Sequence, residues 1–169
     1  MGTTTGIRQG NTGFKWIKGD VTPTILSLPM VLGASFYTGN VVTLSYTSGS
    51  VRLAAEADTT LFGVCKHAIT SPAAGDEIQV IPFKSDYVWE VVCAAGCAGG
   101  DPPGYRGHDL DLEIPTTGYH RVDTGASTLH FVCVGYHPAD ETSTSQGNRL
   151  WVKCKPTVSI YEAAVPPGT

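Results

Sequence analysis

Residues 39–54 read GNVVTLSYTSGSVRLA, and this stretch decides the fold class. Val41 to Tyr46 and Val51 to Ala54 are two short runs rich in β-branched, aliphatic and aromatic residues. The residues between them, Thr47-Ser48-Gly49-Ser50, are typical of a turn. Two such runs on either side of a short turn that contains glycine predict a β-hairpin.

Further short runs of β character follow the hairpin at close spacing, and turn residues separate each run from the next. They are Leu61 to His67, Glu77 to Phe83, Tyr87 to Cys93, Asp109 to Ile114, Leu129 to Gly135, Leu150 to Lys155 and Val158 to Tyr161. This pattern predicts an all-β fold, a small barrel or sandwich of about eight or nine short strands. No internal repeat of fixed period accompanies the pattern.

The composition agrees with a β protein that is rich in turns. The 169 residues include 20 Gly and 11 Pro, and 15% of them are charged. With 11 Lys and Arg against 15 Asp and Glu, the formal net charge is −4, which disfavours nucleic acid as a partner because phosphate neutralisation needs a basic surface. No run approaches the roughly 18 apolar residues of a membrane span, so we expect no membrane contact either. The N-terminus also has no apolar signal segment, which favours assembly in the cytoplasm.

Residues 1–38 differ from the rest and predict an extended N-terminal arm, with residues 39–169 as the body. The main apolar cluster of the arm is Phe14-Lys15-Trp16-Ile17. Its first nineteen residues hold Arg8, Lys15 and Lys18 and no acid, so they carry +3 while the remaining residues carry −7. This segregation favours docking of the arm on an acidic surface. Because an arm has no local core, we expect Trp16 to anchor it in a partner or in the body.

Two loop insertions are expected to interrupt the body, at residues 94–107 and 138–148. The first reads AAGCAGGDPPGYRG, a composition that fits neither a regular strand nor a helix. Insertions of this kind lie on the surface, where contacts usually occur. Tyr105 and Arg106 in the first insertion are therefore further candidates for partner binding.

An alternating acidic segment is the first candidate for chemistry. Asp109, Asp111 and Glu113 alternate with aliphatic residues, so in a strand their carboxylates share one face. With His108 and His120 nearby, they could form a site for a hard cation or an acid/base pair. A solvated strand face with an apolar back is the simpler interpretation, and it is the one that we expect.

The cysteines predict reduced, mostly buried thiols, because their number is odd and the chain is long enough to build a core without disulfides. Cys93 and Cys97 could instead form a disulfide or half of a zinc site, although structural zinc sites usually have two tight pairs. The five cysteines are Cys65, Cys93, Cys97, Cys133 and Cys154.

Nothing in the sequence predicts an enzyme. His130 lies three residues before Cys133, and along a strand this offset places the two side chains on opposite faces. No Gly-x-Ser-x-Gly elbow and no Walker loop occurs. We therefore expect no catalytic residue, no cofactor and no metal.

Aromatic side chains leave a sugar-binding groove open as an alternative. Trp89 and Trp151 alternate with apolar neighbours inside predicted strands and are expected in the core. The aromatic residues that could line such a groove are Trp16, Trp89, Trp151, Tyr105, Tyr119 and Tyr136.

Four segments resemble capsid decoration (cement) proteins of tailed bacteriophages. In that family a G-(D/N)-V-V hairpin opens a short barrel, and a hydrophobic-G-V strand and an A-G-D-x-hydrophobic-x-V strand follow. The resemblance covers residues 39–92 well and 108–161 weakly. The matching segments here are Gly39-Asn40-Val41-Val42, Val51-Arg52-Leu53-Ala54, Leu61-Phe62-Gly63-Val64 and Ala73-Ala74-Gly75-Asp76-Glu77-Ile78-Gln79-Val80.

The resemblance implies a non-enzymatic protein on the outer surface of a virion capsid, where it bridges neighbouring capsomers. Its partner would be the major capsid protein, and it would act as a homo-oligomer, a trimer or a dimer. The alternative is a carbohydrate-binding or receptor-binding head of a virion fibre. The residues expected to contact the partner are Arg8, Phe14, Lys15, Trp16, Ile17, Lys18, Tyr105 and Arg106.

Overall fold

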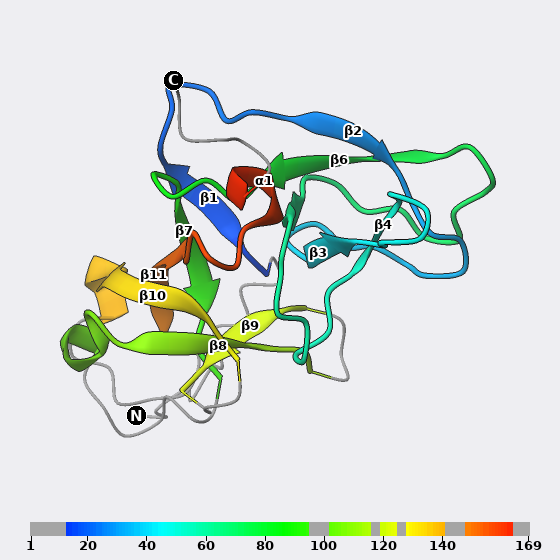
Figure 1. Ribbon diagram of the computed structural model, residues 1–169. Coiled ribbons are helices and arrows are strands. Elements are labelled where there is room, and N and C mark those ends of the chain that lie inside the picture. The colour runs from blue at the N-terminus through cyan, green and yellow to red at the C-terminus, as the bar shows by residue number, and fades with distance from the viewer. Residues whose placement is uncertain (1–12, 95–101, 116–118, 125–127, 141–147, 164–169) are drawn as a thin grey trace, which may run out of the picture.

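Figure 1 shows the computed structural model, which describes residues 13–94, 102–115, 119–124, 128–140 and 148–163. Among these residues, eleven strands form two antiparallel sheets of six and five strands, and no closed barrel. The all-β prediction is confirmed as a sandwich, with more strands than the sequence indicated. No helix in the described part of the chain is both long and apolar enough to cross a membrane.

The five-stranded sheet has the order β2-β6-β5-β3-β4. The predicted hairpin consists of β3 and β4, and Gly49 in its turn has a positive φ of 66°. The two ends of the sheet meet at one point, because Met30, just after β2, forms a single bridge to Val51 of β4. The strands are β2 (Leu26–Pro29), β3 (Val41–Leu44), β4 (Val51–Leu53), β5 (Gly63–Cys65) and β6 (Glu77–Pro82).

The six-stranded sheet has the order β1-β7-β11-β10-β8-β9. It curls in the same way, because Cys93, just after β7, bridges to Val122 of β9. Its strands are β1 (Lys15–Lys18), β7 (Val88–Val92), β8 (Asp109–Glu113), β9 (Arg121–Asp123), β10 (Leu129–Tyr136) and β11 (Arg149–Cys154). The short helices are η2 (Pro102–Tyr105) and η3 (Pro138–Asp140), which lie in the predicted insertions, and α1 (Ile160–Ala163).

Apart from β1, the two sheets share one topology. When the strands of each sheet are numbered in chain order, β2 to β6 and β7 to β11 both give the spatial order 1-5-4-2-3. In both sheets the residue after the first strand forms a parallel bridge to the third strand. We call residues 26–83 the first unit and residues 89–155 the second unit. The fold is therefore an internal duplication, which the sequence carries without a repeat of fixed period.

The pairing registers of the two units also correspond. Cys65 lies opposite Val80 in the first unit, and Cys133 lies opposite Val152 in the second. The other strand pairs follow the same correspondence. Examples are Leu28–Ile78 with Val91–Leu150, Val64–Ile81 with Val132–Lys153, and Leu44–Val51 with Leu112–Val122.

A tight turn before the second strand of each unit repeats in sequence as well as in geometry. Gly39 and Gly107 have φ angles of 87° and 84°, which L side chains rarely adopt. Their N–H groups donate to the carbonyls of Cys65 and Cys133, at 2.9 and 2.7 Å. The identical residues at equivalent positions are Tyr37/Tyr105, Gly39/Gly107, Leu44/Leu112, Val51/Val122, Thr60/Thr128, Leu61/Leu129, Val64/Val132, Cys65/Cys133 and Val80/Val152.

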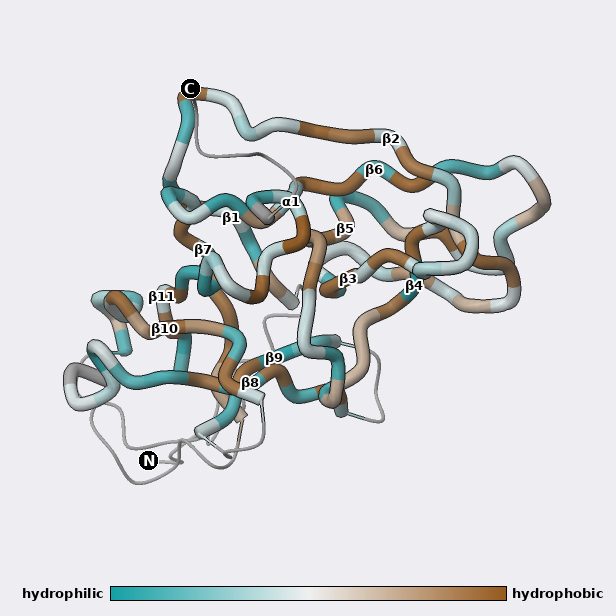
Figure 2. The backbone as a smooth tube through the Cα atoms, viewed as in Figure 1, coloured by the Kyte–Doolittle hydropathy of each residue, from teal (hydrophilic) through white to brown (hydrophobic). Residues whose placement is uncertain are grey.

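The two units share a hydrophobic core. Phe83 of the first unit contacts Trp89 and Phe131 of the second, with ring centroids 5.3 and 5.6 Å apart. Figure 2 shows apolar segments, coloured brown, in strands of both sheets. A smaller cluster lies within the curled five-stranded sheet. It consists of Met30, Phe36, Val42, Val51, Phe62, Cys65, Ile78 and Val80.

The segment predicted as an arm belongs to the body from Phe14 onward. Strands β1 and β2 lie at the edges of the two sheets, and Phe14 is only 3% exposed. Residues 1–12, with Arg8, lie outside the described residues. No local sequence pattern indicates this placement, because Phe14 packs into a core built by residues far along the chain.

The last predicted strand, Val158 to Tyr161, is also wrong. Ser159 makes one bridge to Leu61, and the chain then turns into helix α1. The Ser159 hydroxyl accepts a hydrogen bond from the Glu162 N–H, as an N-cap does. The signal was present in the sequence, because Ser-x-x-Glu is the pattern of a capping box.

Candidate functional site

Strand β1 is the outermost strand of the six-stranded sheet, and it consists of four of the predicted partner-binding residues. It pairs with β7 on one side, and no other described strand pairs with its outer side. Lys15 and Lys18 are exposed, whereas Trp16 and Ile17 are partly buried. This edge therefore offers backbone hydrogen-bonding groups between two cations, an arrangement that suits the addition of a strand.

Phe14 fixes the start of β1 and does not face a partner. Its ring packs against Phe131 and Phe83, with centroids 5.0 and 6.3 Å away. Its N–H donates to the carbonyl of Gly39, at 2.9 Å. The expectation that Phe14 contacts a partner is therefore wrong, because this side chain is part of the core.

Trp16 packs against the body of its own chain. Its ring meets Tyr87 edge to face at a centroid distance of 6.0 Å. The Nε1 atom is buried and has no hydrogen-bond partner among the described residues. Of the two anchoring roles expected from the sequence, the structure shows the one within the chain.

Tyr87 holds the connection between β1 and β2 in place. Its hydroxyl donates to the Asp20 carboxylate and accepts from the Thr24 N–H, both at 2.9 Å. Lys84 donates to the same Asp20 oxygen at 2.9 Å. The hydrogen bond from Lys84, followed by the bond from Tyr87, holds the pKa of Asp20 below its usual value. The N-terminal strands are thus tied to the sheets, which composition alone did not indicate.

Tyr105 and Arg106 lie in the glycine turn of the second unit. Tyr105 packs against the shared core, and its ring lies 6.1 Å from that of His108. The exposed Arg106 guanidinium stacks over Tyr136 at 5.8 Å from the ring centroid. These contacts join the two residues to β8 and β10, so the structure does not show them in one site with β1.

The acidic strand β8 does not present the solvated face that the sequence predicted. Asp109 and Glu113 form ion pairs with Lys155 and Arg121, at 2.7 and 2.5 Å. Asp111, between them, is buried. The prediction fails at Asp111 because its carboxylate contacts the buried His130 ring and accepts from the Thr128 N–H.

His130 is the partner of Asp111, and it lies fully inside the protein. Its Nδ1 is 2.8 Å from the Asp111 carboxylate, and its Nε2 is 2.6 Å from the carbonyl oxygen of Asp58. A carbonyl can only accept, so Nε2 carries a proton. Because both ring nitrogens are engaged and the exposed fraction is 0%, the ring is closed off from solvent. The arrangement suits a structural tie between β8, β10 and the loop after β4.

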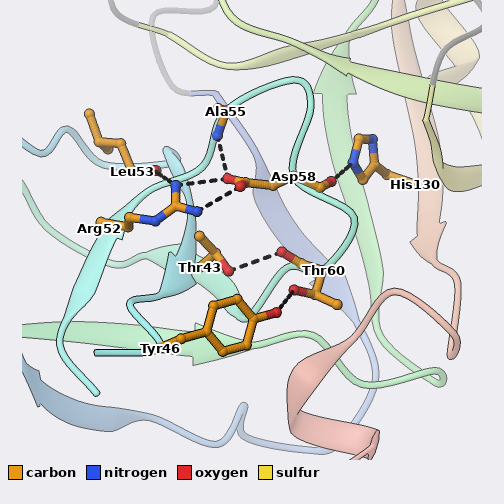
Figure 3. Close-up of polar contacts among 8 residues, drawn as sticks. All are labelled: Thr43, Tyr46, Arg52, Leu53, Ala55, Asp58, Thr60 and His130. Carbon is orange, nitrogen blue, oxygen red and sulfur yellow. Dashed lines mark hydrogen bonds and ion pairs between the residues drawn. The ribbon is translucent and has the colours of Figure 1, made fainter. Parts of the chain in front are cut away.

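Figure 3 shows how the far end of this tie is fixed. The Arg52 guanidinium makes two hydrogen bonds to the Asp58 carboxylate, at 2.9 and 2.6 Å, and the Ala55 N–H donates a third at 2.7 Å. Burial by itself would raise the pKa of Asp58, but the bonds from Arg52 and Ala55 outweigh it and hold the pKa below its usual value. The loop therefore presents the Asp58 carbonyl to His130 in a fixed position.

The residues considered for a metal site are not brought together. His108 is exposed, whereas His120 is buried and its Nδ1 accepts from the Val41 N–H at 2.9 Å. Burial lowers the pKa of His120 to about 4. Across the described ranges, no group of three or more His, Cys, Asp or Glu side chains is arranged to hold a metal ion.

The cysteines differ from the prediction at one position. Cys65, Cys133 and Cys154 are buried free thiols, as expected. Cys93 is disulfide-bonded, so the expectation that all five are reduced is wrong. Cys97 lies outside the described residues. The sulfur of Cys93 is committed to this bond, which argues against the zinc interpretation.

The aromatic residues considered for a sugar groove are divided between the core and the surface. Trp89 is fully buried, as predicted. Trp151 is partly buried, and its Nε1 donates to Glu90 at 3.1 Å. Tyr119 lies beside Tyr37, with ring centroids 6.0 Å apart.

Exposed apolar side chains gather around β2, which the sequence analysis did not single out. Val21 and Leu32, on either side of this strand, are 104% and 55% exposed. The signal that could have found this surface is the complete absence of charged residues from position 21 to position 34.

No protein-family model, no curated protein and no solved structure matches this chain.

Proposed function

We propose that this chain is a capsid decoration protein that binds the outer surface of a viral shell and bridges neighbouring capsomers. The observation that carries the proposal is the outer edge of β1, with which no other strand of the described residues pairs and where Lys15 and Lys18 are exposed. Arg8 precedes this edge in the same acid-free segment of the sequence. Residues 1–19 carry a net charge of +3, whereas the remaining residues of the chain carry −7. The positive β1 edge would therefore select an acidic, extended segment of the major capsid protein.

The segments that resemble the decoration family support the proposal through their common location. They form β3, β4, β5 and the approach to β6, which are neighbouring strands of one sheet. Their glycines stand where the backbone needs them. Gly39 and Gly75 have φ angles of 87° and 92°, and a Cβ at Gly63 would lie 2.3 Å from the carbonyl oxygen of Ile81.

The physical task of such a protein suits a modest contact. Each copy needs only a small interface, because many equivalent contacts on one shell add up to resistance against internal pressure. Strand addition at β1 would supply main-chain hydrogen bonds, and the lysines would fix orientation and exclude basic segments. Because a shell presents many such contacts at once, we expect this protein to bind an assembled shell more strongly than the free capsid protein.

Co-sedimentation tests the proposal. The full chain is mixed with expanded tailed-phage shells, and separately with the unassembled capsid protein of the same phages. We expect saturable binding to shells, weak binding to the free subunit, and weaker binding as salt is added. Absence of binding to any shell, together with binding to a glycan array, would favour the fibre-head alternative.

A charge reversal locates the contact. Lys18→Glu should weaken shell binding about tenfold, because it places a negative charge at the β1 edge. Lys66→Glu is the matched control, since Lys66 is also exposed but follows β5 on the other sheet. Equal loss in both variants would mean that only the overall charge matters and that β1 is not the docking edge.

A further inference from the structure

The duplication exposes a difference between two equivalent strand edges. In the second unit, β1 covers the first part of the outer edge of β7, with Trp16 opposite Trp89 and Lys18 opposite Val88. The end of that edge closes through the bridge from Cys93 to β9. The outer edge of β7 is thus occupied along most of its length.

In the first unit the equivalent edge is only half occupied. β2 corresponds to β7, and its end closes through the equivalent bridge from Met30 to β4. The pairing registers of the two units show which residues of this edge are equivalent to the part of β7 that pairs with β1. They are Ile25, Leu26 and Ser27, which correspond to Val88, Trp89 and Glu90. No described strand pairs with these three residues on their outer side. The fold therefore shows, in its other half, how a strand fits this position.

The surroundings of this edge are apolar. Four of the eight large, exposed apolar side chains of the described residues lie between positions 21 and 32. They are Val21, Ile25, Val31 and Leu32. Figure 2 shows β2 as an apolar stretch along the outer margin of the molecule. An apolar edge with no described strand beside it invites pairing with another strand.

The charge pattern identifies the occupant. Symmetric antiparallel pairing places a short strand opposite the same strand of the second copy, so a segment whose charges share one sign repels its copy, whereas a segment without charge pairs at no electrostatic cost. Positions 21–34 meet this condition, although the chain has 11 basic and 15 acidic residues. The β1 edge does not meet it, since Lys15 and Lys18 of one copy would lie close to the same two lysines of the other copy. We propose that two copies of this chain associate by antiparallel pairing of their β2 edges.

The dimer would be isologous, with one twofold axis through the paired β2 strands. It would cover the exposed apolar side chains of both copies and leave both β1 edges available. The inference does not depend on the proposed function, because it rests on the duplicated fold and on the apolar, uncharged surroundings of β2. Under that function, however, one dimer would present two docking edges to a shell.

Sedimentation equilibrium of the full chain over a range of concentrations tests this pairing. We expect a reversible dimer, and we expect Ile25→Lys to weaken it at least tenfold by placing like charges across the axis. Tyr46→Lys is the matched control, because Tyr46 is an exposed apolar residue, 85% accessible, on the β3–β4 turn. A chain that stays monomeric at all concentrations, or a dimer that survives Ile25→Lys, would overturn the proposal. Near-ultraviolet circular dichroism checks that each variant is folded.

Cross-linking keeps the test decisive if Ile25→Lys does not fold. Ser27→Cys places a thiol on the exposed face of β2, and the three free thiols among the described residues are buried. Oxidation should give a covalent dimer of Ser27→Cys and none of Thr47→Cys, whose exposed site lies in the β3–β4 turn. Equal cross-linking of both variants would contradict pairing at β2. Loss of shell binding in a monomeric Ile25→Lys variant, with the unmodified chain also monomeric, would instead assign the edge to the capsid protein.

Discussion

His130 donates a hydrogen bond from Nε2 to the backbone carbonyl of Asp58, 2.6 Å away, and this bond joins the two duplicated units. His130 lies on β10 of the second unit, and Asp58 lies in the loop after β4 of the first. The other ring nitrogen faces Asp111 on β8. One buried side chain therefore connects both sheets through polar contacts, within a contact region that is otherwise largely apolar.

The duplication suggests how to test the energetic role of this contact. Phe62 and Thr43 stand in the first unit where His130 and Asp111 stand in the second. His130→Phe alone should lower the free energy of unfolding by about 3 kcal/mol, because it removes the His130 contact of the buried Asp111 carboxylate and puts an apolar ring beside that charge. Urea unfolding measures the change.

The double variant Asp111→Thr and His130→Phe is the matched comparison. It removes both members of the polar pair and installs the residues of the first unit. We expect it to cost less than the sum of the two single variants by about 1–2 kcal/mol, because neither partner is left uncompensated. Strict additivity would show that the two side chains are not coupled.

Stability should fall in mild acid because of His120. Its pKa in the folded protein is lowered to about 4 from 6.5, so the unfolded chain binds more protons between these values. The contribution is complete above pH 6.5 and is lost as the pH falls toward 4. At about 1.4 kcal/mol per pKa unit, the loss is about 3 kcal/mol. Urea unfolding at a series of pH values measures it.

The variant His120→Asn isolates this contribution. An asparagine oxygen can accept the Val41 N–H in place of Nδ1 and does not titrate. Its stability should therefore change less with pH between 4 and 6.5 than that of the unmodified chain. A slope that is the same in both proteins would assign the effect to other groups.

Truncations should separate the edge strand from the residues before it. Removal of residues 1–12 leaves Phe14 and β1 in place and should preserve the folded state. Removal of residues 1–19 deletes Phe14 from the shared core and should cost at least about 3 kcal/mol. Thermal unfolding followed by circular dichroism measures both. If the chain that lacks residues 1–19 were as stable as the full chain, β1 would contribute nothing to the stability of the sheet.

The thiol content should be three per chain when the protein is unfolded without reductant. Cys65, Cys133 and Cys154 are free, and Cys93 is disulfide-bonded. Cys97 is then the remaining cysteine with which Cys93 can pair inside one chain. A titration that finds five thiols would mean that Cys93 is reduced in solution. A count of four would indicate a bond between two chains.

The strands that the sequence predicted correctly are those with an apolar side facing a large core. Glu77 to Phe83 and Leu150 to Lys155 are examples, and the alternating burial along β6 and β11 reflects burial on one face. Strands β1, β2 and β9 were missed because they are short and lie at sheet edges. At an edge, half of the backbone groups and many side chains meet solvent, so the pattern is weak.

The candidate site was predictable only in part. The charge of Lys15 and Lys18 indicated a basic contact, and both side chains are exposed. The roles of Phe14 and Asp111 depend on residues far away in the chain, which no local pattern contains. The repeat stayed hidden because the connections between equivalent strands differ in length in the two units. The Tyr-x-Gly turn occurs in both units, at Tyr37 and Tyr105, but no single spacing relates all the equivalent residues.

The position of β1 also has a consequence for the order in which the chain is completed during synthesis. Lys15 pairs with Glu90, which the ribosome adds 75 residues later. Domains begin to fold from the N-terminus while the rest is still being made. The first strand to emerge must therefore wait for β7, with Phe14 and Trp16 exposed in the nascent chain, and it can dock only when the second unit has begun to form.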